Sequence, residues 1–137
     1  MIDFEGLNYI AIVLAWIVNI AVGAFWYSPA GFAKQWSKHT GVDMMKSPKE
    51  ETDRAIIIVA ISSLLQAFAL ALLLNSLTPQ NIGEAIVATL VLWFGFTAIT
   101  TIGNTLYQRQ GWGLWWINAS FFLVVMLINT FILYFLQ

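Results

Sequence analysis

Neutral polar side chains are the groups in this sequence that could bind a ligand within otherwise apolar stretches. Six of them are expected at comparable depth: Asn19, Ser63, Thr100, Thr101, Asn104 and Asn118. Because amides and hydroxyls both donate and accept hydrogen bonds, they predict one polar cluster for a small polar solute, an ion or a lipid headgroup. The alternative is that these side chains only join helices to one another.

Ionisable side chains are missing from the middle of every apolar stretch, which disfavours a proton-coupled transporter. The sequence has no cysteine, so disulfides, thiolate metal sites and thiol nucleophiles are excluded. His39 is the single histidine and has no carboxylate close to it in sequence, so we expect a solvated side chain and no metal site. Hydrolase, kinase and phosphate-loop motifs are absent, so we expect no cofactor and place enzymatic activity third among the possible functions.

The composition is that of a membrane protein. Of the 137 residues, 60% are hydrophobic and only 9% are charged, whereas soluble domains carry about a quarter of their residues as charged ones. A spanning helix needs about 20 mainly apolar residues. The uncharged stretches predict an all-α, polytopic bundle in a single membrane domain, 1–137. Its four transmembrane helices are expected at about 8–27, 55–75, 82–107 and 114–136.

Three prolines each follow a hydroxyl residue, in Ser28-Pro29, Ser47-Pro48 and Thr78-Pro79. Ser and Thr cap free N–H groups and proline suits the first helical position, so each pair predicts a helix start. The first start opens a short amphipathic helix in the headgroup region, from Pro29 to about Thr40, within the loop 28–54. The second start, Ser47-Pro48, is followed by Glu50 as the glutamate of a capping box. Because this start lies well before the apolar stretch, the second long helix is expected to protrude from the membrane.

The basic residues predict the orientation. Five of the six lie in the loop 28–54 and the sixth is Arg109, so both loops are expected to face the cytoplasm and both termini to face outward. Aromatic residues near that face are expected to anchor it: Trp26, Tyr27, Trp36, Tyr107, Trp112, Trp115 and Trp116. The formal net charge of -1 predicts no nucleic-acid partner, and membrane lipid is the expected surroundings.

Small residues recur every four positions on the first two long helices. The expected helix-packing positions are Ala11, Ala15, Gly23, Ala67 and Ala71. Small side chains let helix backbones approach closely. The two ribbons pair either with each other inside the chain or with another subunit.

Three aromatic motifs carry a family resemblance. They are Gly23-Ala24-Phe25-Trp26-Tyr27-Ser28-Pro29 followed by Phe32 and Trp36, then Trp93-Phe94-Gly95-Phe96, then Asn104 and Tyr107 leading to Ile117-Asn118. The sequence resembles a bacterial membrane family catalogued as domain of unknown function 1761. The resemblance implies four spans in the bacterial cytoplasmic (inner) membrane. It directs attention to Trp26, Tyr27, Asn104 and Asn118, which the expected topology brings toward the cytoplasmic face.

Two functions from different classes are compatible with these features. The first is a homo-oligomeric bundle that binds or conducts a small solute, an ion or a lipid, because four helices enclose little space on their own. The second is a structural or regulatory membrane protein that docks a partner through its cytoplasmic loop, with its polar residues only locking the helices together.

Overall fold

The computed structural model describes residues 1–136. Its long helices are α1 (Tyr9–Trp26), α3 (Lys49–Leu77), a third span in three consecutive segments, and α6 (Gly111–Leu136). The third span consists of α4 (Ile82–Trp93), the π-helical η1 (Phe94–Ala98) and α5 (Ile99–Tyr107), while the short α2 (Ala33–Thr40) lies between the first two spans. All four spans are long and apolar enough to cross a membrane, so the predicted all-α bundle of four transmembrane helices is confirmed.

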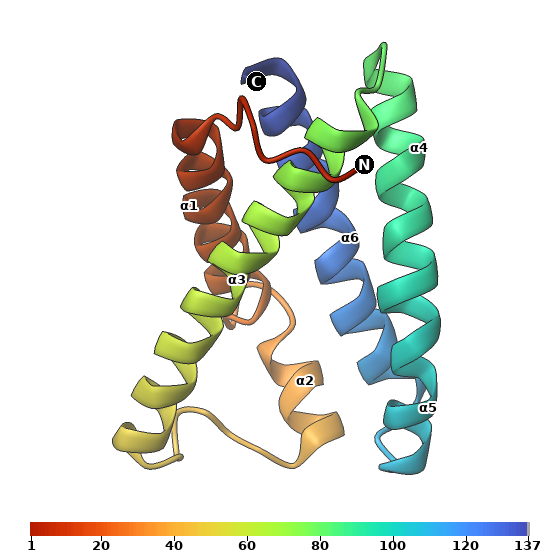
Figure 1. The fold of residues 1–137 in the computed structure, drawn as a ribbon. Coiled ribbons are helices and arrows are strands. Elements are labelled where there is room, and N and C mark those ends of the chain that lie inside the picture. Colours follow the sequence, from red (N-terminus) through yellow and green to blue (C-terminus); the bar gives the residue numbers. More distant parts are fainter. Residues whose placement is uncertain (137) are drawn as a thin grey trace.

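The two ends of the bundle are built from different segments. Both termini and the connection 78–81 lie at one end, which we call the terminal end (Figure 1). The α2 helix and the turn between α5 and α6 lie at the other, which we call the α2 end. At the terminal end, Asn8 Nδ2 donates a hydrogen bond to Leu136 O, and Asp3 N donates to Ser76 Oγ at 2.8 Å. These bonds tie the N-terminal segment to the ends of α6 and α3.

None of the three hydroxyl–proline pairs starts a helix at the position that the sequence predicted. The α3 helix begins at Lys49 with Pro48 as its N-cap residue, one position later than predicted. No side chain caps it, because Ser47 Oγ donates to Asp43 O in the preceding loop at 2.9 Å. The prediction of a capping box at the start of α3 was therefore wrong. At 29 residues, α3 is about 43 Å long and exceeds the roughly 30 Å hydrocarbon core of a membrane.

The other two predicted starts were wrong by several residues. Thr78 ends α3 in a left-handed conformation (φ 47°), and α4 begins at Ile82 with Asn81 as its N-cap. Asn81 Oδ1 accepts the Glu84 backbone N–H at 3.0 Å, which satisfies one of the free donors of the helix start. The α2 helix begins at Ala33 rather than Pro29, because Ser28 closes a separate turn at the end of α1.

The apolar core occupies the terminal half of the bundle. Its buried members come from α1, α3, α4, α6 and the N-terminal segment: Leu7, Ala11, Ile12, Ala15, Ala67, Leu70, Ala71, Leu74, Ala85 and Leu133. Many of them are alanines, so the helix backbones approach closely here. The residues that α3 contributes to this cluster all come from its second half.

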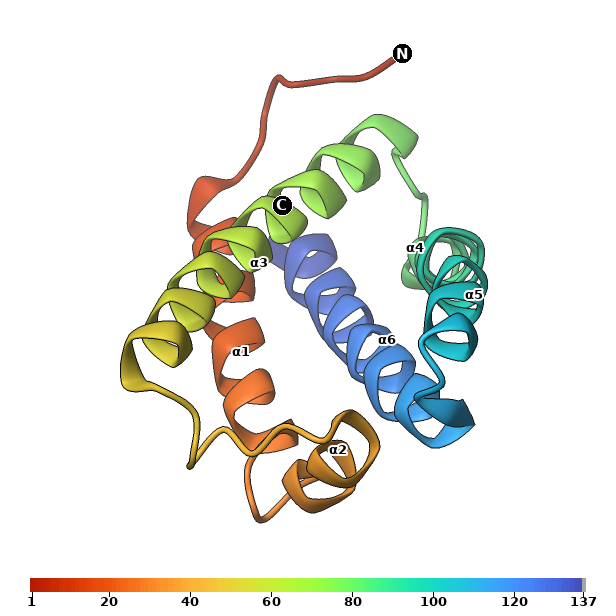
Figure 2. The ribbon, with the colours of Figure 1, turned by 90° about the horizontal axis from the view of Figure 1, so that it is seen from below.

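The α3 helix crosses the bundle obliquely, and its first half diverges from α6 toward the α2 end (Figures 1 and 2). Four consecutive residues, Ile56, Ile57, Ile58 and Val59, are each more than half exposed. Successive helical residues are about 100° apart, so four of them cover a full turn. No face of this turn of α3 is therefore buried against another helix.

A π-helical turn interrupts the third span. One extra residue in the turn removes backbone carbonyls from the regular hydrogen-bond ladder. Thr100 Oγ1 donates to Phe96 O at 2.9 Å, and Thr101 Oγ1 donates to Thr97 O at 2.7 Å. The Trp115 indole on α6 donates to Ala98 O at 2.9 Å. The threonine bonds satisfy carbonyls of η1 within the third span, and the Trp115 bond holds η1 against α6.

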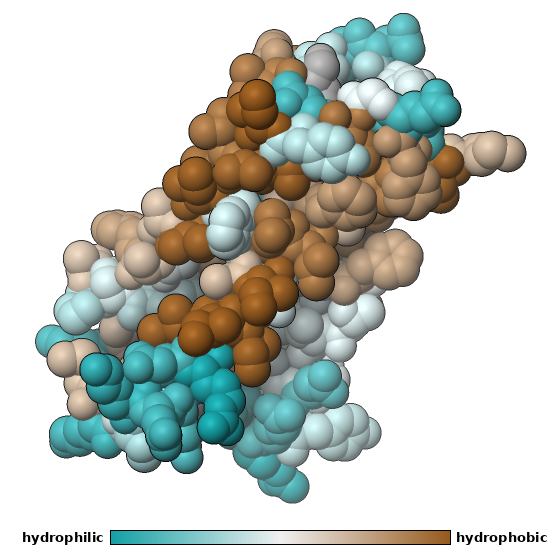
Figure 3. All heavy atoms as spheres, turned by 60° about the vertical axis from the view of Figure 1, so that its left-hand side comes forward, coloured by the Kyte–Doolittle hydropathy of each residue, from teal (hydrophilic) through white to brown (hydrophobic). Residues whose placement is uncertain are grey.

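The molecular surface carries a broad hydrophobic region between hydrophilic ends (Figure 3). Large apolar side chains are exposed on all four spans, including Ile17, Ile57, Val91 and Phe131. Exposed apolar area on this scale suits contact with lipid tails rather than water.

Candidate functional site

The turn between α1 and α2 is shaped by a glycine. A Cβ at Gly31 would collide with the backbone carbonyl oxygens of Phe25 and Trp26. With no side chain, Gly31 donates its N–H to Ser28 O at 2.9 Å, and the next residue, Phe32, donates to Trp26 O at 2.7 Å. The chain thus folds back on the end of α1 and delivers α2 to the same side as α6.

This turn gathers aromatic and amide side chains, which we call the Tyr27 cluster: Trp26, Tyr27, Phe32, Trp36, Asn118 and Phe121. The Tyr27 hydroxyl donates to Asn118 Oδ1 at 2.8 Å, and the Trp26 indole donates to Ile117 O at 3.0 Å. The ring of Phe121 lies 5.3 Å from that of Tyr27. The cluster therefore joins the end of α1 and α2 to α6 through both rings and hydrogen bonds.

The polar centre of the cluster presents donors to its surroundings. Burial raises the pKa of Tyr27, the first residue after α1, to about 12, so the phenol keeps its proton and remains a donor. The Tyr27 hydroxyl donates its hydrogen bond to Asn118 Oδ1, while Asn118 Nδ2 has no hydrogen-bond partner among residues 1–136. Asn118 is only half-buried. The arrangement can therefore bind a hydrogen-bond acceptor at the edge of an aromatic surface.

The α2 helix presents two different faces. Phe32, Trp36 and His39 contact the protein: the Phe32 ring is 5.0 Å from Trp26, and the Trp36 ring is 6.4 Å from Tyr27. The His39 imidazole covers Gly113 so closely that a Cβ there would collide with it. The expectation of a solvated His39 was therefore wrong, because Gly113 leaves room for the ring to be half-buried on α6. The exposed residues of α2 are Lys34, Gln35 and Lys38.

The six polar residues predicted to form one cluster lie in four separate places. Asn19 contacts Ser63 O on α3, with Nδ2 at 3.5 Å, while Ser63 Oγ bonds within its own helix to Ala60 O. Thr100 and Thr101 bond to carbonyls of η1, and Asn118 bonds to Tyr27.

Asn104 is exposed on α5, with no side-chain partner among the described residues. The prediction of one cluster was wrong because α6 lies between α1 and α5 (Figures 1 and 2) and the π-turn reorients the end of the third span.

The seven predicted anchor residues also divide into two groups. Trp26 and Trp115 donate their indole N–H groups to carbonyls of neighbouring helical segments, and the Trp36 ring lies edge-to-face with that of Tyr27. Tyr27 is partly exposed and is also the centre of the Tyr27 cluster. The remaining side chains are exposed near the α2 end: Tyr107, Trp112 and Trp116.

The small-residue ribbons of α1 and α3 meet inside the chain. Ala11, Ala15, Ala67 and Ala71 are completely buried in one core cluster. Gly23 differs, since a Cβ there would lie 3.5 Å from the Phe121 ring on α6. Gly23 therefore lies against the Tyr27 cluster, at a distance where a Cβ would make ordinary van der Waals contact.

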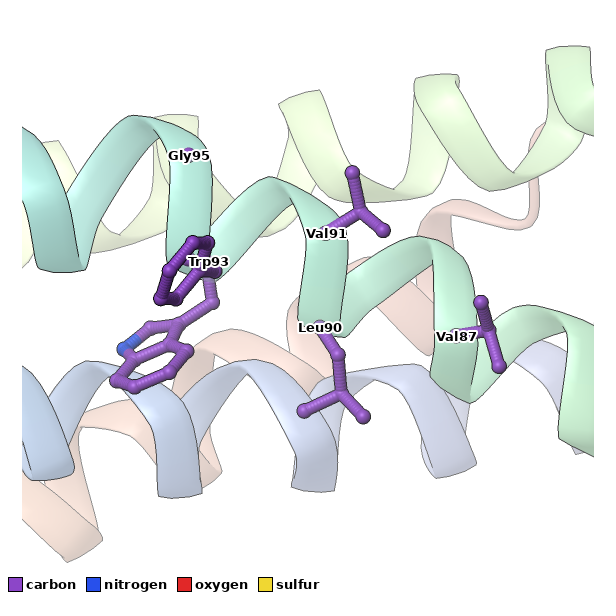
Figure 4. A pocket seen from close by; sticks show the side chains of 6 residues that line it. Val87, Leu90, Val91, Trp93 and Gly95 are labelled. Carbon is purple, nitrogen blue, oxygen red and sulfur yellow. The ribbon is translucent and has the colours of Figure 1, made fainter.

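Two shallow hollows lie on the third span, away from the Tyr27 cluster. One is lined by Val87, Leu90, Val91, Trp93, Phe94 and Gly95 (Figure 4). The other is lined by Gly103, Leu106, Tyr107 and Arg109. Both are wide open, and the first has an almost entirely apolar wall. Residues 1–136 contain no group of three His, Cys, Asp or Glu side chains that could hold a metal ion.

Several residues of the site were not predicted from the sequence. Trp16 and Trp93 donate to Ala60 O and Ala119 O, each at 2.8 Å, and so join α1 to α3 and α4 to α6. Gly31 followed directly by a phenylalanine at the end of an aromatic motif was a usable signal for a tight turn. Phe121 offered none, because phenylalanines are frequent throughout the apolar stretches.

Comparison with protein families gives one match. A model described as "Protein of unknown function (DUF1761)" matches residues 10–134, and so covers all four spans and the Tyr27 cluster. No curated protein and no solved structure matches the chain.

Proposed function

Because the chain belongs to the DUF1761 family, whose description assigns no activity, we propose a function from the geometry of the site. The protein binds a membrane lipid, whose phosphate-bearing headgroup accepts a hydrogen bond at the Tyr27 cluster. The observation that carries this proposal is the half-buried Asn118, whose Oδ1 is occupied by Tyr27 while Nδ2 is left as an unpartnered donor. A phosphate oxygen is an acceptor of matching chemistry.

The location of the cluster supports a lipid over a soluble ligand. It begins where α1 ends and reaches α6 near its start, so it lies at the edge of the apolar belt. Tyrosine and tryptophan prefer this boundary because their rings favour the acyl region and their polar atoms favour the headgroups. The exposed lysines of α2, Lys34 and Lys38, add positive charge at the same end of the bundle.

The terminal half of the bundle supports binding rather than conduction by a single chain. Its interior is filled by the apolar core cluster, in which Ala11, Ala15, Ala67 and Leu133 are completely buried. A conducted ion or polar solute would have to pass through this region without polar partners, which is costly. The proposed lipid needs only the surface of the α2 end.

The basic residues give the proposed orientation. The lysines of the loop 28–54 and Arg109 share the α2 end, and the termini share the other. By the positive-inside rule the α2 end faces the cytoplasm and the Tyr27 cluster binds a lipid of the inner leaflet.

Native mass spectrometry of the full chain, released from nanodiscs of phosphatidylcholine and phosphatidylglycerol, tests this proposal. We expect Asn118→Leu to lower the bound phospholipid about tenfold, because a tenfold loss corresponds to about 1.4 kcal/mol, the size of one good hydrogen bond. Tyr27→Phe keeps the ring but frees Asn118 to reorient, so its loss should be smaller. Asn104→Leu is the matched control, an amide on an exposed helix face away from the cluster.

Two further arms of the experiment identify what is bound. Diacylglycerol with the same acyl chains should be retained poorly, because it lacks the phosphate acceptor. Excess inorganic phosphate should displace the phospholipid only if the free ion is the true ligand. Equal lipid retention by Asn118→Leu and Asn104→Leu would contradict the proposal.

A further inference from the structure

Three helices each place a polar residue where the apolar core cluster ends. These residues, which we call the Asn129 layer, are Asn19 on α1, Ser63 on α3 and Asn129 on α6. Each is four residues, or about one helical turn, closer to the α2 end than a core-cluster residue of its own helix: Ala15, Ala67 and Leu133. The layer therefore lies between the closed terminal half and the region where α3 diverges.

The antiparallel contacts between α1 and α6 place the two asparagines at neighbouring levels. Asn8 bonds to Leu136 O, and Trp26 bonds to Ile117 O. Interpolation between these contacts puts Asn129 opposite Ala15, about one turn from Asn19. Both side chains are buried in the bundle, with exposed fractions of 0% for Asn129 and 4% for Asn19.

Three polar atoms of this layer have no hydrogen-bond partner among residues 1–136. They are Asn19 Oδ1, Asn129 Oδ1 and Asn129 Nδ2. The bond from Asn19 Nδ2 to Ser63 O is long at 3.5 Å. Buried amide atoms without partners are rare in folded proteins, because leaving them unpaired costs about as much as losing a hydrogen bond.

Neighbouring hydroxyls have already committed their protons and cannot donate to the unpaired amide oxygens. Thr89 and Thr130, both completely buried, hydrogen-bond to each other at 2.5 Å. Each hydroxyl also lies within hydrogen-bond distance of a carbonyl of its own helix, Ala85 O for Thr89 and Met126 O for Thr130, so the two hydroxyl protons serve these three contacts. Ser63 Oγ is likewise bonded to Ala60 O. The layer needs a partner that is not a protein side chain.

We propose that the Asn129 layer binds water inside the membrane-spanning bundle. The unpartnered atoms include both acceptors and a donor, so the ligand must donate and accept, as water does. No Asp, Glu, Lys, Arg or His lies in the spans near this level, so nothing there favours a charged ligand. One or two bridging molecules satisfy the two amides and hold α1, α3 and α6 in register.

Solid-state NMR of the full chain in phosphatidylcholine bilayers, with ¹⁵N-labelled asparagine, tests this site directly. Water-edited spectra should show transfer from water protons to the side-chain amides of Asn19 and Asn129. The variants Asn129→Leu and Asn19→Leu assign the two signals by deleting them. An Asn129 amide that receives no magnetisation from water, while the exposed Asn104 amide does, overturns the proposal.

Thermal unfolding of the same protein gives an independent measurement. Leucine has the same branched heavy-atom skeleton as asparagine, so Asn129→Leu removes the amide without leaving a cavity. If water binds there, the variant loses those hydrogen bonds and its Tm falls by several degrees, whereas Asn104→Leu leaves Tm unchanged. If the amide is dry, the substitution removes a buried unpaired group, Tm rises, and the proposal fails.

The double variant Asn19→Leu with Asn129→Leu shows whether the two amides share their water. Shared water predicts that the fall in Tm of the double variant is smaller than the sum of the two single falls, because either substitution alone disrupts the bridge. Strictly additive falls would contradict a shared site. The proposal involves neither Tyr27 nor Asn118, so it stands or fails separately from the proposed lipid site.

Discussion

The two halves of the bundle are held together in different ways. In the interior of the terminal half, alanines of α1 and α3 are completely buried in one cluster of apolar side chains. In the α2 half, α3 has left the bundle, and the contacts are indole and phenol hydrogen bonds from Trp26, Tyr27 and Trp115. The first kind of contact depends on shape, and the second on a few directed bonds.

Because of this difference, we expect the terminal half to determine stability and the α2 half to carry the proposed lipid binding. Close packing of small residues leaves no unsatisfied group and no room for a ligand, so the terminal half serves as a rigid base. The α2 half exposes donors and aromatic rings on its surface, where the proposed lipid can reach them. Variants in the first half should therefore change unfolding, and variants in the second should change binding as well.

The largest effect is expected from overpacking the terminal half. Ala15→Leu places three extra carbons in the fully buried contact with α3, which must move away. We expect a loss of about 3 kcal/mol in the free energy of unfolding, at the upper end of overpacking costs. Denaturant titration in mixed micelles measures it, with the exposed Ala21→Leu on the same helix as control. Equal stability of the two variants would show that α1 and α3 do not pack through these alanines.

The next effect concerns the turn that builds the Tyr27 cluster. Gly31→Ala introduces a Cβ that collides with two backbone carbonyls, so the turn must open and break the bonds from Gly31 N and Phe32 N. Two hydrogen bonds correspond to about 2 kcal/mol. Unlike Ala15→Leu, this variant should also lower lipid retention.

The matched control for Gly31→Ala is Gly103→Ala, where a Cβ meets no atom within 4 Å. It lies in a regular helix, so alanine should be neutral or slightly stabilising. Unfolding and lipid retention are measured on both variants. A Gly31→Ala protein that matches Gly103→Ala in both would refute the role of the turn.

A smaller effect is expected from a single directed bond. Trp26→Phe retains an aromatic ring beside Phe32 but removes the N–H that donates to Ile117 O. We expect a loss of about 1 kcal/mol in unfolding free energy. Trp112→Phe serves as control, since that indole is exposed and donates to no described residue.

The smallest effect on the fold is expected at Asn104. Its side chain is exposed on α5, so Asn104→Leu should change the unfolding free energy of one chain by less than about 0.5 kcal/mol. The predicted homo-oligomer can be tested with the same variant. If copies meet through this face, native mass spectrometry will show fewer of them, because an amide on a membrane helix favours association with another amide.

The spans were predictable because each depends on local composition. A run of uncharged apolar residues specifies a membrane helix whatever its neighbours do, and the helices Ile82–Tyr107 and Gly111–Leu136 follow the uncharged stretches closely. The helix starts were less predictable. Ser28 and Thr78 have the residue type of an N-cap, yet one closes a turn and the other ends α3, because tertiary contacts compete with local capping.

The polar positions were recognised by residue type but wrongly grouped. Depth along the membrane can be estimated by counting residues from the end of a span, so Asn19, Asn104 and Asn118 were correctly treated as residues of the spans. Their directions depend on helix rotation and crossing angle, which counting does not give. The π-turn adds to this, because one extra residue rotates everything after Phe94 by about a quarter of a turn.

The sequence by itself determined that this protein is an all-α bundle of four membrane helices, because hydrophobicity acts residue by residue and needs no partner. Only the tertiary structure decided which polar groups remain unpaired. Asn118 Nδ2 and the Asn129 amide are left available by the path of α3 and the turn at Gly31. Whether a hydrogen bond forms depends on which helix lies opposite, and that is a property of the packed bundle.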